Sequence, residues 1–359
     1  MTTSGSNGRT VAVTGAAGFI AGRLIRHLCM DDSVERVLGF DVRAPSFGHE
    51  KFVFDEVDVR NPALEARLNG VDTVVHLAFV MDPIRDETEM RDINVNGSQN
   101  VFRCAGAAGV GKIIYTSSAT AYGAHPDNDV PLTETSPLRA NLDFSYPAHK
   151  LEVEYVVKEF RDEYPDVKVT VFRPAIVFGP HVDNAWSHLI ELPVLLGVRG
   201  YRPPFQFVHE DDVASALAFA LDNDLDGPYN LAPEGWLSWD EARQIIGRRN
   251  VELAEPAAFT LAERLWSMGL AEAPAGMLHY VMHPWVVSGD KLKDAGFVCR
   301  RSSGEVLREV ADRNRDYVRL GTSRFKKGDL ARGAAAGAGL LGATIGLVAL
   351  RRHRSPART

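Results

Sequence analysis

A glycine-rich turn near the N-terminus constrains the fold of this 359-residue chain more than any other feature. The run Thr14–Gly22 follows a strand-like segment over Thr10–Thr14 and opens a helix-like segment over Phe19–Met30. Gly15 permits a tight turn, and Gly18 lets the backbone approach a pyrophosphate that lies against the helix N-terminus. The turn therefore predicts a dinucleotide site, to which we assign Gly15, Ala17, Gly18, Phe19 and Ile20.

An acidic residue at the end of the next strand indicates which dinucleotide binds. The strand-like run Val34–Asp41 ends 19 residues beyond Gly22. A carboxylate at Asp41 accepts hydrogen bonds from the adenosine ribose and repels a 2′-phosphate, which favours NAD over NADP as the cofactor. Arg43 is also assigned to the cofactor site, and it complicates this choice because a nearby arginine can accommodate that phosphate.

Strand-like and helix-like segments alternate through the first half of the chain. This alternation predicts an α/β fold with a doubly wound parallel sheet, covered by helices on both faces, as in a Rossmann fold. Further strands are expected at Asp72–Ala78, Lys112–Ser117, Val167–Phe172 and Tyr229–Leu231, and further helices at Glu87–Ala108, Ser145–Tyr164 and Asp211–Asp222.

The composition of the chain changes after Pro174, where proline and glycine become frequent and the strand-like and helix-like segments become shorter. Ligands of doubly wound folds bind at the carboxyl edge of the sheet, so the later residues should form a smaller lobe over that edge. We therefore expect a disordered start (1–9), a Rossmann domain (10–180) to which residues 205–232 return, a substrate-binding lobe (181–320) and a basic tail (324–359).

A tyrosine and a lysine at the start of one expected helix predict catalysis. Tyr146 and Lys150 are four residues apart and share a helix face. A close lysine cation lowers the pKa of a tyrosine, so Tyr146 can take the proton of a substrate alcohol while hydride leaves for a nicotinamide. Tyr146 and Lys150 are also assigned to the cofactor site, where Lys150 is expected to hold the nicotinamide ribose.

The serine-rich end of an earlier strand supplies a third catalytic group. Within residues 115–123, Ser118 is expected to hydrogen-bond the substrate oxygen, together with Tyr146 and Lys150 at the catalytic site. Ser117 would point to the opposite side if the strand continues, and we assign it to the cofactor site.

Together these motifs resemble those of the extended short-chain dehydrogenase/reductase family, in its NAD-dependent epimerase/dehydratase group, over roughly residues 10–300. Ser118, Tyr146 and Lys150 match the family's catalytic positions, and Phe207–Val213 resembles its late strand-to-helix motif. The resemblance implies a small-molecule substrate and a homodimer. It also implies cofactor contacts at Asp58, Val59, Leu77, Ala78, Phe79, Asn94 and Pro174.

Departures from the family's pattern bear on the substrate. Alanine and threonine follow Ser118, where the family's dehydratases carry an Asp-Glu pair, so dehydration of a sugar nucleotide is disfavoured. Many sugar-nucleotide epimerases have an asparagine where this chain has Ile176, and that asparagine helps to hold the diphosphate. Arg199 or Arg202 would have to bind the phosphates instead.

Charge and cysteine usage disfavour other functions. The net charge of −7 combines an acidic body with a tail that has eight basic residues and one acid between 324 and 359. An acidic body disfavours nucleic-acid binding. The three cysteines form no disulfide framework and no metal-binding pattern, so we expect no metal and a cytoplasmic location.

The tail contains an uncharged segment, 333–350, that is followed by a basic run. A bilayer span needs about 20 predominantly apolar residues, and this segment is slightly shorter and rich in glycine and alanine. Its glycines have the small-xxx-small spacing of packed membrane helices. A membrane contact through 333–350 and a flexible or self-associating tail are both retained as alternatives.

Three functions remain open from the sequence. We favour an NAD-dependent epimerase or oxidoreductase that acts on a secondary alcohol of a nucleotide sugar. The alternative is a dehydrogenase of the hydroxysteroid type, or a carbonyl reductase, that acts on an apolar alcohol or ketone, which Ile176 and the Trp- and Met-bearing stretch 265–285 favour. A catalytically silent NAD-binding regulator is least favoured, since the chain keeps both Tyr146 and Lys150.

Four polar residues near these motifs are assigned structural roles. His149 is expected to face solvent from its helix, and His209 to be a hydrogen-bonded structural histidine. Asp211 or Asp212 is expected to cap the helix that follows.

Overall fold

The computed structural model describes residues 8–84, 86–320 and 323–329. Its centre is a seven-stranded sheet in which every neighbouring pair is parallel. The strand order is β10-β6-β5-β4-β1-β2-β3, which reverses direction beside β1 as in a Rossmann fold. The strands are β1 (Arg9–Thr14), β2 (Val34–Asp41), β3 (Phe52–Glu56), β4 (Thr73–His76), β5 (Lys112–Thr116), β6 (Lys168–Pro174) and β10 (Gly227–Leu231).

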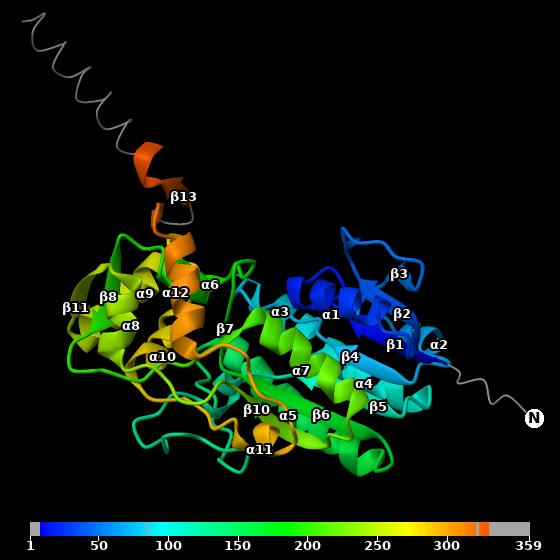
Figure 1. Ribbon diagram of the computed structural model, residues 1–359. Helices are drawn as coiled ribbons and strands as arrows, with labels where there is room; N and C mark the ends of the chain where they lie inside the picture. Colours follow the sequence, from blue (N-terminus) through cyan, green and yellow to red (C-terminus); the bar gives the residue numbers. More distant parts are fainter. Residues whose placement is uncertain (1–7, 85, 321–322, 330–359) are drawn as a thin grey trace, which may run out of the picture.

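Helices cover both faces of this sheet (Figure 1). Val11 and Val13 of β1 belong to the same buried cluster as residues of α1 and α7, whereas Ala12 between them packs with α2, α4 and α5 on the other face. This alternation is the two-residue period of a strand buried on both sides. The helices are α1 (Phe19–Cys29), α2 (Leu64–Arg67), α3 (Glu87–Arg91), α4 (Gly97–Ala107), α5 (Ser145–Glu163) and α7 (Glu210–Asp222), with a π-helical segment over Asp92–Asn96.

A smaller lobe lies beside the carboxyl edge of the sheet (Figure 1). Two short parallel pairs organise it: β7 with β9, and β8 with β11. Its elements are β7 (Ile176–Phe178), α6 (Ala185–Leu189), β8 (Val194–Val198), β9 (Phe207–His209), α8 (Trp239–Ile246), β11 (Arg249–Leu253), α9 (Glu255–Ser267), α10 (His279–Met282) and α12 (Ser303–Arg313), with the hairpin β12 (Tyr317–Leu320) and β13 (Ser323–Lys326) beyond it. The short helix α11 (Asp290–Asp294) instead packs against β10.

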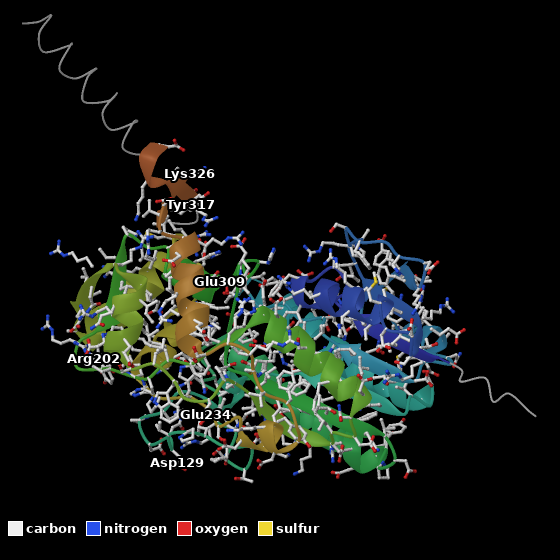
Figure 2. The ribbon with its side chains drawn as sticks, viewed as in Figure 1. Asp129, Arg202, Glu234, Glu309, Tyr317 and Lys326 are labelled. Carbon is white, nitrogen blue, oxygen red and sulfur yellow. The ribbon has the colours of Figure 1, made fainter. Side chains whose placement is uncertain are left out.

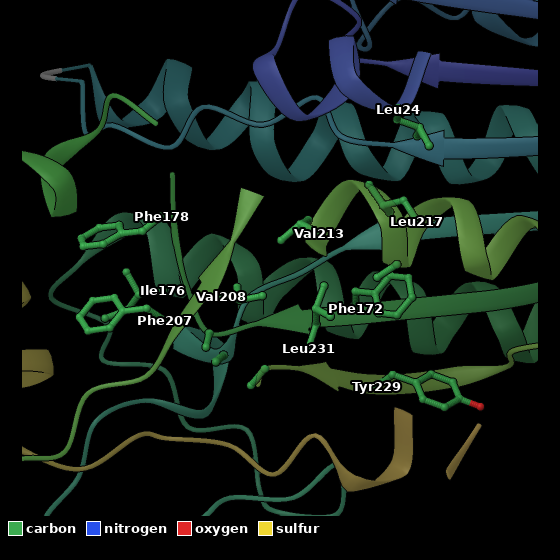
Figure 3. Close-up of a cluster of buried hydrophobic side chains, with 14 of the residues drawn as sticks. Leu24, Phe172, Ile176, Phe178, Phe207, Val208, Val213, Leu217, Tyr229 and Leu231 are labelled. Carbon is green, nitrogen blue, oxygen red and sulfur yellow. The ribbon is translucent and has the colours of Figure 1, made fainter. Parts of the chain in front are cut away.

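One buried cluster joins the two parts (Figure 3). Phe172 of β6 and Leu231 of β10 belong to it on the sheet side, and Phe178 of β7 and Phe207 of β9 belong to it on the lobe side. The rings of Phe178 and Phe207 stack with their centroids 4.8 Å apart. The lobe is therefore continuous with the core of the sheet.

The predicted fold class, a doubly wound α/β fold, is confirmed. The strands and helices expected from the sequence are present with ends that differ by a few residues, except that the π-helical segment divides the expected helix Glu87–Ala108 into α3 and α4. The strand β1 starts at Arg9, which the sequence had assigned to a disordered start. The reason is tertiary, since the Arg9 guanidinium bonds the carbonyl of Leu221 at 2.9 Å and the carboxylate of Asp222 at 2.7 Å.

The apolar tail segment 333–350, for which we retained a membrane contact, lies outside the described residues. Within 8–84, 86–320 and 323–329, no helix combines the length and apolar character that a membrane crossing requires.

Candidate active site

The glycine turn closes between β1 and α1 with almost no space beside it. Gly15 has φ of +70°, and a Cβ atom there would lie 2.7 Å from the backbone nitrogen of Ala78. Both the left-handed backbone and this approach require glycine. Gly18 is the N-cap of α1 and offers no side-chain cap, so the first N–H groups of the helix remain available to an anion.

Asp41 lies at the end of β2 and ties this turn to the sheet. One carboxylate oxygen accepts a hydrogen bond from the backbone nitrogen of Ala17 at 3.0 Å, and the other accepts one from that of Arg43 at 2.9 Å. Each oxygen retains a free lone pair, so the carboxylate can still accept hydrogen bonds from a ribose.

The turn opens into a cavity of about 220 Å³, which we call the catalytic cavity. Many of the residues that the sequence assigned to the site line it: Gly15, Gly18, Phe19, Ile20, Leu77, Phe79, Ser117, Ser118, Tyr146, Lys150 and Pro174. The structure thus brings the glycine turn, the ends of β4 and β5, and the start of α5 to one place.

Ser118 is oriented by its neighbour. Its hydroxyl oxygen accepts hydrogen bonds from the backbone nitrogen of Thr120 at 3.1 Å and from the Thr120 hydroxyl at 2.9 Å. A serine hydroxyl accepts two bonds and donates one, so the Ser118 proton is left to donate toward Tyr146 or a ligand. The carbonyl of Thr120 is itself bonded by the hydroxyl of Tyr280 at 2.9 Å, which fixes this turn from the lobe side.

Lys150 is buried and held by uncharged partners. Its ammonium nitrogen donates to the carbonyl oxygen of Thr116 at 2.8 Å and lies 3.5 Å from the ring centroid of Phe79. Burial lowers the pKa of Lys150 to about 7, although the Glu154 carboxylate acts in the opposite direction. A lysine at this position therefore changes its charge near neutral pH.

The expected lowering of the tyrosine pKa by the lysine is wrong for this structure. Burial raises the pKa of Tyr146 to about 12, and the opposing effect comes from a hydrogen bond with Ser118. The Lys150 nitrogen lies 5.8 Å from the Tyr146 ring centroid because it points to Thr116 and Phe79. The pKa of Tyr146 must therefore fall before the phenol can act as a base. A positive charge placed beside the phenol, such as that of a nicotinamide ring, would lower this pKa.

Asn94 holds the loop after β4, whose residues Leu77, Phe79 and Met81 line the catalytic cavity. Its side chain accepts a hydrogen bond from the backbone nitrogen of Val80 at 2.7 Å and donates one to the Val80 carbonyl at 2.9 Å. It also contacts the ring of His149 at 3.3 Å. His149 is only 5% exposed, so the expected solvent-facing position is wrong. The reason is that α5 packs here against the helix that carries Asn94.

The cap expected from Asp211 or Asp212 is also wrong. His209 is the N-cap of α7, and its ring accepts a hydrogen bond from the backbone nitrogen of Asp211 at 3.0 Å. Asp212 instead accepts hydrogen bonds from the backbone nitrogens of Arg300 and Arg301. The buried His209 is a hydrogen-bonded structural residue, as expected.

Some residues assigned to the cofactor lie outside the lining of the catalytic cavity: Ala17, Asp41, Arg43, Asp58, Val59, Ala78 and Asn94. Ala17, Asp41 and Arg43 are neighbours at the turn, and Ala78 presses on Gly15. The Asp58 carboxylate accepts hydrogen bonds from Arg60, and Val59 is buried.

Neither arginine proposed as a phosphate ligand lines the catalytic cavity. Arg202 bonds the Glu252 carboxylate at 2.6 Å and lies over the ring of Trp239. Figure 2 shows Arg202 at the outer edge of the lobe, away from the sheet. Arg199 is exposed next to β8. The expectation that one of them replaces the missing asparagine is therefore not met in this arrangement.

The sequence missed the residues that close the cavity from the lobe. Trp186 and Trp285 line it with ring centroids 5.7 Å apart, and Met81 and Asn184 line it from two loops. These residues belong to no local motif. The signals in the sequence were the rarity of tryptophan, of which the chain has five, and the position of Trp285 at the end of the stretch 265–285 that favoured an apolar substrate.

The depressed pKa of Lys150 predicts a pH-dependent stability. Between about pH 7 and pH 10 the unfolded chain holds a proton at Lys150 that the folded chain lacks, so folding stability rises with pH in this window. We expect the free energy of unfolding of the wild type, relative to that of Lys150→Met, to be lowest below pH 7 and to rise by a few kcal/mol toward pH 10. Urea denaturation at several pH values measures this difference.

The exposed Lys158, on the same helix, provides the control for this measurement. Lys158→Met should leave the wild-type pH dependence unchanged. A constant difference between the wild type and Lys150→Met across the window would contradict the burial argument.

The sequence of this chain matches a known protein family and several individual proteins. Residues 11–232 match the model of the NAD dependent epimerase/dehydratase family. An uncharacterized protein of Mycobacterium tuberculosis is 31% identical over 251 residues, which cover 67% of this chain and 66% of that protein. The N-acetyl-alpha-D-glucosaminyl-diphospho-ditrans,octacis-undecaprenol 4-epimerase of Escherichia coli O157:H7 is 31% identical over 172 residues, 47% of this chain and 49% of the relative.

Solved structures share the fold at lower identity. The UDP-glucose 4-epimerase of Thermotoga maritima, solved with UDP-glucose, has a TM-score of 0.64 at 19% identity and covers 85% of this chain and 98% of its own. The dTDP-glucose 4,6-dehydratase of Streptomyces venezuelae, solved with NAD, has a TM-score of 0.66 at 22% identity and covers 85% and 97%. With its glycine turn, its parallel sheet and a family match over more than half its length, the chain belongs to the NAD-dependent epimerase/dehydratase family.

Proposed function

We propose that this chain catalyses NAD-dependent hydride transfer at a secondary alcohol, and that this alcohol belongs to an apolar molecule. One observation carries the choice of substrate. The catalytic cavity is walled on its lobe side by Ile176, Trp186 and Trp285, and Lys150 is the only charged residue that lines it among the described residues. A diphosphate would find no cation other than Lys150 there, whereas an apolar body gains by burial.

The residues around the cavity fit a bound dinucleotide. Gly18, which carries no side chain, lets the backbone approach a pyrophosphate, the uncapped start of α1 offers N–H groups to it, and Asp41 retains acceptors for a ribose. Bound NAD supplies the hydride acceptor and the positive charge of its nicotinamide.

The chain's own residues then handle the proton. Tyr146 takes the proton of the substrate hydroxyl as the C–H bond breaks, and Ser118 donates a hydrogen bond to the same oxygen. Lys150, fixed by the Thr116 carbonyl, contributes positive charge to the catalytic cavity when it is protonated. The aromatic walls exclude water from the reacting atoms.

We also propose that the chain prefers NAD to NADP because of Asp41. Asp41→Asn removes the negative charge but keeps an oxygen that can accept the bond from the Ala17 nitrogen. We expect the ratio of NADP affinity to NAD affinity to rise by about tenfold, since repulsion of the 2′-phosphate is lost. Calorimetric titration with the two dinucleotides measures this ratio.

Glu56 supplies the matched control for Asp41. It ends the neighbouring strand β3, directly opposite Asp41 in the register, and it is exposed. Glu56→Gln removes one charge from the same edge and should leave the ratio within about twofold. Equal changes in both variants would mean that general charge, and not Asp41, sets the preference.

A second candidate substrate is a sugar joined to a diphosphate. It is favoured by the E. coli relative, whose name specifies a diphospho-sugar 4-epimerase. In that reaction Tyr146 would serve first as base and then as acid, and the cofactor would be regenerated within one turnover. The apolar wall at Ile176 counts against a nucleotide but is compatible with an apolar carrier of the sugar.

A substrate panel separates the two candidates. Purified enzyme with NAD is given hydroxysteroids and long secondary alcohols in one set, and nucleotide sugars in another. NADH formation with the first set supports the apolar alcohol. Epimer or keto-sugar formation with the second set, and no turnover with the first, would show that the proposed substrate class is wrong.

A further inference from the structure

The lobe contains two further cavities, of which one adjoins the catalytic cavity and the other adjoins the first. The middle cavity, of about 90 Å³, shares Ile176 and Trp186 with the catalytic cavity. The outer cavity, of about 220 Å³, shares Leu189, Leu192, Leu196 and Val281 with the middle cavity. The three cavities therefore form a row that runs from Tyr146 through the lobe toward α9.

Apolar side chains make up most of the walls of the row. Phe178, Phe205 and Phe207 line the middle cavity together with Trp239, and Arg243 is its only charged residue among those described. Figure 3 shows Ile176, Phe178 and Phe207 gathered at one end of the buried cluster. Such walls offer little to a sugar or a phosphate, whereas they suit a hydrocarbon.

The charged residues of the outer cavity already bond one another. His188 pairs with the Glu272 carboxylate, and Arg319 donates to Glu272 at 2.9 Å and to Glu191 at 3.3 Å. The remaining lining comes mainly from aliphatic side chains of β8, α9 and the loop that follows α9.

The helix α9 is rich in apolar residues, but most of them are not buried. Only Ala258 of its residues is buried, whereas Leu261 is 41% exposed and Leu270, just beyond its end, is 52% exposed. Both leucines line the outer cavity. An apolar ligand there would remove this surface from water, which is a favourable change.

We propose that these three cavities form one binding site for an elongated hydrocarbon chain, carried by the same molecule whose secondary alcohol reacts at Tyr146. The inference rests on the proposed function for the position of the alcohol, and it assigns the middle and outer cavities to the rest of the substrate. The ligand class is a long-chain or polyprenyl-like secondary alcohol.

The test is direct binding, which does not depend on turnover. Secondary alkanols from butanol to dodecanol are titrated into the full-length protein with saturating NADH, which cannot oxidise them, and the tryptophan fluorescence is followed, since Trp186, Trp239 and Trp285 line the catalytic and middle cavities. We expect affinity to increase about fourfold for each added methylene until the row is filled. Equal affinity for short and long alkanols would overturn the proposal.

Two variants interrupt the row at different places. Leu192→Arg places a charge between the middle and outer cavities, and Ala262→Trp fills the outer cavity from α9. Each should keep the affinity for butanol and remove the gain for the longest alkanols. Met30→Arg, at an exposed apolar position at the end of α1, is the control and should behave as the wild type. NAD binding verifies that each variant is folded.

The outcomes separate this inference from the proposed function. Chain-length-dependent binding without any alkanol oxidation would leave the hydrocarbon site in place and refute the proposed reaction. Oxidation without chain-length dependence, or chain-length dependence that survives both lobe variants, would refute the hydrocarbon site alone. If deletion of residues 330–359 raises the affinity for every alkanol, the row accommodates the chain's own tail and the proposal is wrong.

Discussion

Replacing Tyr146 by phenylalanine should lower kcat by about a thousandfold, whichever secondary alcohol proves to be the substrate. The phenol lines the catalytic cavity beside the Lys150 ammonium and the Ser118 hydroxyl, and no carboxylate or histidine of the described residues lines it. The substitution removes one oxygen atom and leaves the ring contact with Phe79, whose centroid lies 5.7 Å away. NAD affinity should therefore stay within about threefold of the wild type.

Tyr155 provides a matched control on the same helix. It is 54% exposed and does not line the cavity, so Tyr155→Phe should leave both kcat and NAD affinity unchanged. Stopped-flow measurement of NADH formation in a single turnover isolates the chemical step. If Tyr146→Phe keeps more than about a tenth of the wild-type rate, Tyr146 is not the general base and the proposed chemistry is wrong.

The fold could be predicted from the sequence where the signal is local. The turn at Gly15 requires a backbone conformation that few residues adopt, and the runs that became β1, β4 and β5 are apolar because both faces of the sheet are covered. The strand β3 was missed because it lies at the sheet edge, where Val53 and Glu56 are exposed and no buried run marks it.

The candidate site divides in the same way. Tyr146 and Lys150 could be identified because one helical turn sets their spacing, and Asp41 because it ends a strand. The contact between Trp186 and Trp285 could not, since these residues are 99 positions apart and meet only through packing of the lobe. His149 was misplaced for a similar reason, because its burial depends on Asn94 of a different helix.

The same division explains why the cofactor could be proposed with more detail than the substrate. A dinucleotide is recognised largely by backbone N–H groups and by one acidic side chain, and both belong to short sequence motifs that can be identified without the structure. The proposed substrate site is lined by side chains from β7, α6, α8 and α9, and their arrangement depends on the packing of the whole lobe. The electrostatics also depend on tertiary structure, since burial reverses the expected effect on the pKa of Tyr146.

Breaking one buried ion pair should destabilise the protein more than any change at its surface. Arg173 of β6 donates two hydrogen bonds to the Glu154 carboxylate of α5, both at 2.9 Å, and each side chain is 6% exposed. Arg173 also donates to the hydroxyl of Tyr122 at 2.8 Å, and that hydroxyl donates to Asn230 of β10. Glu154→Leu leaves the guanidinium charge buried without its counter-ion. We expect a loss of about 3–5 kcal/mol in the free energy of unfolding.

The double variant separates the stabilisation that the ion pair provides from the penalty of leaving one buried charge unpaired. Removing both partners, as Glu154→Leu with Arg173→Leu, should cost less than Glu154→Leu alone, because no charge then remains unpaired. The exposed Glu159 on the same helix gives the control, and Glu159→Leu should change stability by less than about 0.5 kcal/mol. Urea denaturation of the four proteins measures these differences. The outcome that contradicts this argument is a double variant whose free energy of unfolding is no higher than that of Glu154→Leu. The attraction between Arg173 and Glu154 would then exceed the cost of burying the two charges, and the loss of that attraction would explain the instability of Glu154→Leu.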